Sequence, residues 1–194
     1  MSVLLLLALA ALRDPMGAGA GSPEAQYQGC PGHEVLAQAD EIAWAPGESR
    51  LEAHRALRNS LGAQLPDAPV RIMLYSHGSH LVTATFSLVA TRNTTGRWHV
   101  NAVGQSQAWV EGSQPWRWAD IDRDLSDAEA QALQAVLDDR CLYLGPTFMH
   151  DRNVVAGGAV QTLEIDVPGH HWIGAWLGLR TRQTQRLVEI VAGQ

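Results

Sequence analysis

Residues 70–90 read VRIMLYSHGSHLVTATFSLVA, and this stretch decides the fold class. In its second half, apolar side chains at even positions from 82 to 90 alternate with Thr83, Thr85 and Ser87. Because successive side chains of a strand point to opposite faces, this period of two predicts an antiparallel strand with one buried face. Positions 70–75 alternate in the same way, and Ser-His-Gly-Ser at 76–79 is typical of a turn. We therefore expect a β-hairpin here.

Three further strands and three helices are expected around this hairpin. The strands are predicted over 98–110, 160–167 and 171–179, and the helices over 48–61, from Ser126 to near Arg140, and over 183–191. Ser126 and Glu129 have the spacing of a capping box, and Gly104 predicts a bulge in its strand. Residues 111–125 and 145–158 are expected to be loops.

This order of elements lacks the regular alternation of strand and helix that a parallel sheet requires. We predict an α+β fold in which an antiparallel sheet of about five strands carries two or three helices, packed mainly on one face. In the helix over 48–61, His54 falls on the apolar face, and Arg58 is expected largely outside it.

The chain begins with an apolar run, VLLLLALAAL, at residues 3–12. Ten helical residues rise about 15 Å, half of a hydrocarbon core, so the run is too short to span a membrane. Its length is typical of the hydrophobic region of a secretory signal peptide, and Ala18-Gly19-Ala20 provides a small-x-small cleavage site. The alternative is a buried first helix of the mature fold.

We accordingly expect a signal peptide at 1–20, an irregular segment at 21–46 and a single domain at 47–194. The protein is expected to be periplasmic or secreted, without a transmembrane segment after processing. Cys30 and Cys141 agree with that compartment, because two cysteines in an exported protein predict one disulfide. The alternative is two buried thiols.

The charged residues exclude several functions. All 14 basic residues are Arg, which is typical of a GC-rich bacterial genome, and 20 acidic residues bring the net charge to −6. A negatively charged chain is repelled by phosphate, so nucleic acid is not an expected partner. The lack of Lys excludes Schiff-base and P-loop lysine chemistry. No cofactor is expected.

Histidine supplies the candidates for metal binding. Eight are present, and His77 and His80 have two residues between them, within a predicted turn. His170 is a third candidate ligand. Zinc needs three or four converging ligands, and neither an HExxH motif nor paired CxxC motifs occur. We therefore expect turn and surface histidines, with metal binding as the alternative.

Tryptophan supplies the candidates for ligand binding. Trp116 and Trp118 lie in the predicted polar loop, and Trp172 in the last strand. Exposed aromatic rings stack on sugars or peptides, so these three residues are candidates for a surface that binds cell-wall glycan or a protein partner. The alternative is that Trp98, Trp109, Trp172 and Trp176 fill the core and that the loop pair staples the loop to the sheet.

No catalytic motif is recognisable. The chain has no G-x-S-x-G elbow, and Ser76, Ser79 and Ser87 lack the context of a nucleophile. We expect a non-catalytic interaction or structural role. Two alternatives remain: a glycan- or peptide-binding surface on the Trp-rich loop, and a metal-dependent or hydrolytic enzyme that uses histidine.

The second half of the chain, residues 97–192, resembles small exported bacterial domains of unknown function. The similarity lies in Gly96-x-Trp98, in the helix start Leu125-Ser126-x2-Glu129, and in the strand Leu163-Glu164-Ile165 followed by a hairpin and a terminal helix. The resemblance implies an exported α+β domain. Such domains have no established catalytic or binding residues, so it assigns no functional residue to this chain.

Overall fold

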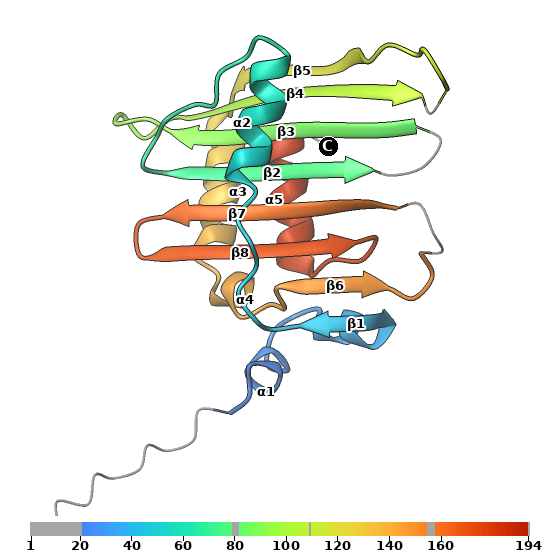
Figure 1. Ribbon diagram of the computed structural model, residues 1–194. Coiled ribbons are helices and arrows are strands. Elements are labelled where there is room, and N and C mark those ends of the chain that lie inside the picture. The colour runs from blue at the N-terminus through green and yellow to red at the C-terminus, as the bar shows by residue number, and fades with distance from the viewer. Residues whose placement is uncertain (1–20, 79–81, 109, 155–157, 194) are drawn as a thin grey trace, which may run out of the picture.

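The computed structural model describes residues 21–78, 82–108, 110–154 and 158–193, with the side chains of all of them except 82 and 118–120. In these residues one sheet of eight strands has the order β1-β6-β8-β7-β2-β3-β4-β5 (Figure 1). All neighbouring strands are antiparallel except β6 and β8, which are parallel. The α+β class is confirmed.

The elements have the following bounds. The strands are β1 (Ala39–Ala43), β2 (Arg71–Gly78), β3 (Val82–Arg92), β4 (Trp98–Ala108), β5 (Trp116–Asp124), β6 (Phe148–Asp151), β7 (Ala159–Val167) and β8 (His170–Leu177). The helices are α1 (Pro23–Tyr27), the 3-10 helix η1 (His33–Gln38), α2 (Leu51–Ser60), α3 (Asp127–Leu137), α4 (Arg140–Tyr143) and α5 (Arg182–Ala192).

The expected hairpin forms the centre of the sheet. Leu74 in β2 lies opposite Leu88 in β3 and, on its other side, opposite Leu163 in β7. All three side chains are buried on the same face, where each contributes about 2 kcal/mol through the loss of apolar surface from water. β2 continues through Gly78, so His77 lies in the strand and not in the predicted turn. Residues 79–81, which join the strands, lie outside the described residues.

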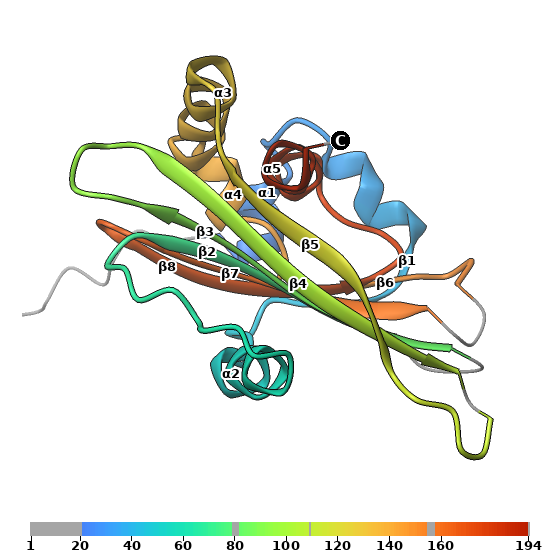
Figure 2. The same ribbon diagram turned by 90° about the horizontal axis from the view of Figure 1, so that it is seen from above.

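The helices form unequal layers on the two faces of the sheet. Figure 2 shows α3 and α5 side by side on one face and α2 alone on the other. Leu133 of α3 and Leu187 of α5 are buried against the apolar face of the central strands. α3 begins with the predicted capping box, in which Ser126 and Glu129 exchange hydrogen bonds. The expectation that the helices pack mainly on one face is therefore confirmed for α3 and α5, whereas α2 lies on the other face.

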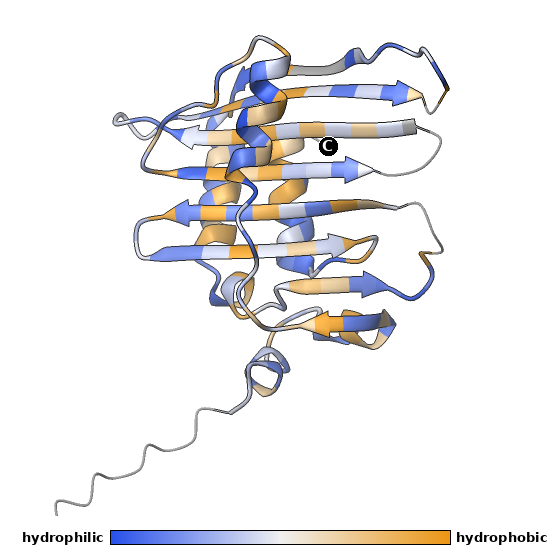
Figure 3. Ribbon diagram, in the orientation of Figure 1, coloured by the Kyte–Doolittle hydropathy of each residue, from blue (hydrophilic) through white to orange (hydrophobic). Residues whose placement is uncertain are grey.

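The sheet has three more strands than expected. β5 occupies most of the predicted loop at 111–125, and β1 and β6 extend the opposite edge. All three lie at or near an edge, where strands are short or carry charged side chains that weaken the apolar pattern. Figure 3 shows hydrophobic colour on the central strands β2 and β7, whereas β5 ends in Asp-Arg-Asp at 122–124. The predicted bulge is present, because the β4–β5 register shifts between Gly104 and Gln105.

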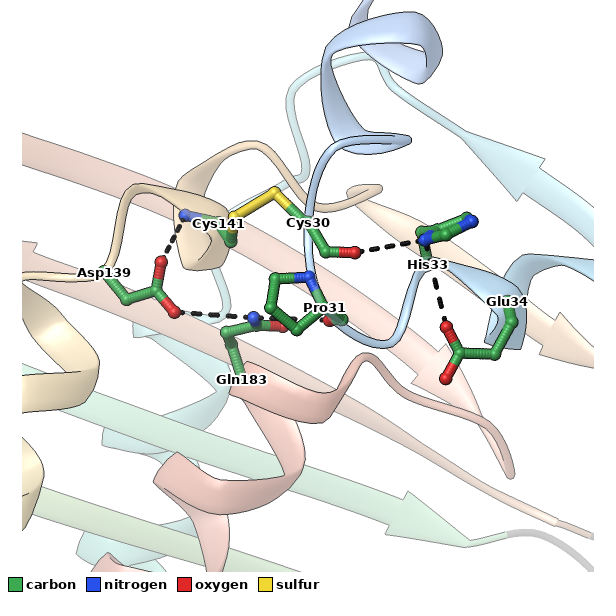
Figure 4. Close-up of a disulfide and its surroundings, with 7 residues drawn as sticks. All are labelled: Cys30, Pro31, His33, Glu34, Asp139, Cys141 and Gln183. Carbon is green, nitrogen blue, oxygen red and sulfur yellow. Dashed lines mark hydrogen bonds and ion pairs between the residues drawn. A yellow bond between two sulfur atoms is a disulfide. The ribbon is translucent and has the colours of Figure 1, made fainter.

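The segment at 21–46 has more regular structure than expected, since it contains α1, η1 and β1. The predicted disulfide is confirmed: Cys30 is bonded to Cys141 in α4, across 111 positions of sequence (Figure 4). The bond therefore holds the N-terminal segment against the helical layer, and it is consistent with an oxidising compartment. The predicted signal peptide, residues 1–20, lies outside the described residues.

Hydrogen bonds support the chain on both sides of the disulfide. Asp139 caps α4 by accepting a hydrogen bond from the Cys141 amide at 2.9 Å. The side-chain amide of Gln183, at the start of α5, reaches both Asp139 and the Pro31 carbonyl, at 3.4 and 3.5 Å (Figure 4). The cross-link thus lies where α4, α5 and the N-terminal segment meet.

We predict that replacing both cysteines, Cys30→Ser with Cys141→Ser, lowers the free energy of unfolding by about 4 kcal/mol, because closing a loop of this length restricts the unfolded chain. Urea denaturation of both proteins under non-reducing conditions measures the difference. Limited proteolysis of the variant is expected to cut first within residues 28–46. Equal midpoints for variant and wild type would contradict the prediction.

Candidate functional site

A polar cluster joins α2 to the sheet. Arg58 was expected on the outer face of its helix, but it is fully buried. Its Nε donates to Ser87 Oγ at 2.7 Å, Nη1 to Asn101 Oδ1 and the Gln64 carbonyl, and Nη2 to the carbonyls of Ser87 and Asn101. These bonds use all five N–H groups of the guanidinium. The prediction for Arg58 is wrong because most of these acceptors belong to β3 and β4, which are distant in sequence from α2 and do not appear in its helical periodicity.

His54 and Ser87 form a second pair in this cluster. His54 Nδ1 lies 2.6 Å from Ser87 Oγ, which already accepts a hydrogen bond from Arg58. The arrangement that satisfies every group has the Ser87 hydroxyl donating to an unprotonated Nδ1. Burial, reinforced by the positive charges of Arg58 and Arg71, lowers the pKa of His54 to about 3. His54 is therefore neutral at physiological pH.

The distance between Ser87 and His54 is that of a nucleophile and its base, but the pair is closed to solvent. Ser87 lies beneath α2 and is 0% exposed, and His54, on the side of α2 that faces the sheet, is 1% exposed. A substrate would have to displace α2 to reach the hydroxyl, and Arg58 already occupies one of its lone pairs. We assign the pair to the attachment of α2. Sequence reasoning missed it, since no motif links a helix residue to a strand residue 33 positions away.

The structure does not bring the candidate metal ligands together. His77 lies opposite Val160 at the start of β7, and His170 lies opposite Val167 at its end. Seven residues of extended strand separate those positions by about 23 Å. His80 lies outside the described residues. Within the described ranges, no group of three or more His, Cys, Asp or Glu side chains is placed to hold a metal ion.

The candidate tryptophans are also dispersed. Trp172 is buried on the face that α3 and α5 cover, with its indole ring directly over Gly174, where a Cβ would come within 2.2 Å of it. Trp116 lies partly exposed on the edge strand β5, five strand positions from β8, or about 24 Å. The side chain of Trp118 and the whole of Trp109 are not described. Trp98, Trp172 and Trp176 are buried, as the alternative predicted.

The face that carries α2 has an uncovered part, which we call the open half. It lies at the C-terminal end of β2 and on the neighbouring parts of β7, β3 and β4. The residues there whose side chains point to the α2 side are His77, Val160, Thr83, Thr85, Gln105 and Gln107. In Figure 1, α2 crosses the left part of these strands, and no described helix lies over the right part. His77 Nδ1 contacts Thr85 Oγ1 at 3.0 Å. The open half is therefore polar, and its side chains are exposed or half-buried except for that of Thr85, which is buried.

The β4–β5 hairpin borders the open half. Figure 2 shows its tip on the same side of the sheet as α2, and Arg117 Nη1 of β5 donates to the Leu61 carbonyl at the end of α2, at 3.3 Å. A cavity of about 610 Å³ lies against the tip, between Thr83 and Gln107 of the sheet and residues 110–113 of the hairpin. The hairpin and α2 thus make this side of the sheet concave.

Apolar side chains are exposed at this end of the molecule. In the described part of the chain the large hydrophobic residues with high exposure are Val110 (69%), Trp116 (47%) and Val160 (40%). Val110 and Val160 adjoin the open half, whereas Trp116 pairs with Ser106 and so points to the face that carries α3 and α5. Exposed apolar groups beside an accessible polar surface are typical of an interaction site.

Comparison with protein-family models, with curated proteins and with solved structures finds no match for the chain. The resemblance to small exported bacterial domains therefore stays a prediction.

We predict that Arg58→Met lowers the free energy of unfolding by about 3 kcal/mol, because it leaves buried acceptors on Ser87 and Asn101 without donors. Chemical denaturation followed by circular dichroism measures the loss. Arg55→Met is the matched control: Arg55 is exposed on the same helix and pairs only with Glu52, so we expect a change under about 0.5 kcal/mol. Similar losses in both variants would refute the assignment of Arg58.

A further prediction concerns pH. The pKa of His54 is lowered to about 3 from 6.5, so the unfolded chain binds a proton that the folded chain does not, and stability decreases as pH falls through this window. Replacing His54 with Asn, whose side-chain oxygen can accept from Ser87, is expected to remove about 2 kcal/mol of the loss between pH 6 and pH 4.5. Asn59→Ala, at an exposed position of the same helix that carries no titratable group, should leave the slope unchanged. Denaturation curves at each pH provide the test.

Proposed function

We propose that this protein is an exported, non-catalytic interaction domain whose ligand-binding surface is the open half of the sheet. The observation that carries the proposal is the exposure of Val110 and Val160 beside a concave polar surface. Hydrogen-bonding groups surrounded by exposed apolar side chains are the usual composition of a recognition surface. The confirmed disulfide supports an oxidising compartment. None of the helices in the described ranges is long and apolar enough to cross a bilayer.

A non-catalytic role is favoured by the burial of the Ser87–His54 pair and by the separation of the candidate histidines. Ser87 is held by Arg58 beneath α2, and His77 and His170 lie at opposite ends of β7. On the open half the groups are imidazole, hydroxyl and amide, which are suited to binding and orienting a ligand.

A cell-envelope glycan is the ligand that these groups favour. The described side chains of the open half carry hydroxyl or amide groups at Thr83, Thr85, Gln105 and Gln107, and these groups are uncharged. Sugar hydroxyls both donate and accept hydrogen bonds, as do these side chains. A protein partner is the alternative, and the experiment below separates the two.

We predict that a photo-crosslinking amino acid in place of Val160 gives a light-dependent adduct in intact cells, because Val160 is exposed within the open half. The same amino acid in place of Glu52, on the outer face of α2, is the control and should give none. Loss of the adduct on treatment with a peptidoglycan hydrolase identifies a glycan, and loss on proteolysis identifies a protein. Equal adducts at both positions, or none at Val160, would overturn the proposed surface.

A further inference from the structure

A second cavity lies at the other end of the sheet, away from the open half. It has a volume of about 320 Å³ and lies between the last turn of α3 and the strand ends that meet there. Val167 at the end of β7 and Val70 just before β2 lie on adjacent strands, and the Arg92 amide donates to the Val70 carbonyl at 3.1 Å. All of its lining residues are among those described.

The floor of this cavity is apolar. Val70 and Val167 line it from the sheet, Leu137 lines it from α3, and Trp98 lines it from the start of β4. Leu137 and Trp98 are buried core residues, so the floor is fixed by the packing of α3 on the sheet. A cavity of this size with an apolar base accommodates the body of a small organic molecule.

The rim of the cavity carries hydrogen-bond donors of Arg92 and His170 that are not used within the described residues. Arg92 makes one side-chain hydrogen bond within the described residues, from Nε to the Gly96 carbonyl at 3.3 Å, which leaves both Nη groups without a protein acceptor. His170 is held by stacking on Tyr143, with the ring centroids 4.1 Å apart and the planes 9° from parallel. Stacking occupies the face of the imidazole and leaves its ring nitrogens, at least one of which carries a proton, available at the edge.

The acidic group of the rim is already engaged. Asp138 Oδ1 accepts a hydrogen bond from Gln134 Nε2 at 2.8 Å. Asp138 also caps the C-terminus of α3, where the helix dipole is negative and repels anions. A negatively charged ligand group is therefore favoured beside Arg92 and His170 and disfavoured beside α3.

We propose that this cavity binds a small organic carboxylate with an apolar body. The carboxylate accepts hydrogen bonds from the Arg92 guanidinium, whose planar donors match its two oxygens, and His170 donates from the other side. The apolar body lies on Val70, Val167, Leu137 and Trp98. The length of β7 separates this cavity from the open half. Ligand binding in the cavity is therefore independent of the proposed interaction surface.

Titration calorimetry with hexanoate tests the proposal, with hexanamide as the neutral probe of the same shape. We expect saturable binding of hexanoate, and a dissociation constant for hexanamide that is weaker by about tenfold or more, because the amide lacks the charge that Arg92 recognises. Amide shifts in two-dimensional NMR should be largest at Val70, Val167 and His170. Equal affinity for both probes, no saturation, or shifts confined elsewhere would overturn the proposal.

The variant Arg92→Gln should weaken hexanoate binding by about tenfold while leaving hexanamide binding unchanged. Arg97→Gln is the matched control, since Arg97 is exposed in the same turn and does not line the cavity. Both replacements are at exposed positions, so the fold is expected to be retained, and circular dichroism checks this. Equal effects of the two variants on hexanoate binding would show that general charge, and not Arg92, attracts the anion.

Discussion

The attachment of α2 depends on the burial of one guanidinium. Removing a charge from water is costly, and the cost is offset only where every donor finds an acceptor. Arg58 meets this condition with neutral groups of β3, β4 and the chain that follows α2. The network therefore fixes where the helix lies on the sheet. The position of α2 in turn determines which part of that face stays uncovered.

The sequence predicts the centre of this fold better than its margins. β2, β3, β7 and β8 are recognisable because one face of each is apolar, and α3 because its first turn carries a capping box. The edge strands β1 and β5 bury little, so selection for apolar residues at alternate positions is weak in them. The disulfide was predictable from cysteine count and compartment, whereas the strand it brings to the edge, β1, was not.

The candidate site was less predictable than the fold, because it is made of residues that are distant in the sequence and are brought together only by the strand order. The spacing of histidines in the sequence gives no information on whether they lie at the same end of a strand, and His77 and His170 lie at opposite ends. Trp116 and Trp172 were candidates for the same surface, but Trp172 is buried and Trp116 is exposed. Arg58 occupies a helix position that faces outward by periodicity, and only the acceptors on β3 and β4 explain its burial.

The free edge of β5 has a consequence for how copies of this protein meet. His99 of β4 lies between Asp122 and Asp124, with a carboxylate oxygen 2.8 Å from Nε2 and another 3.0 Å from Nδ1. Two molecules approaching along this edge would bring their aspartates against each other, and like charges on facing strands repel. An edge of this kind resists the strand-to-strand stacking from which fibrils and aggregates grow.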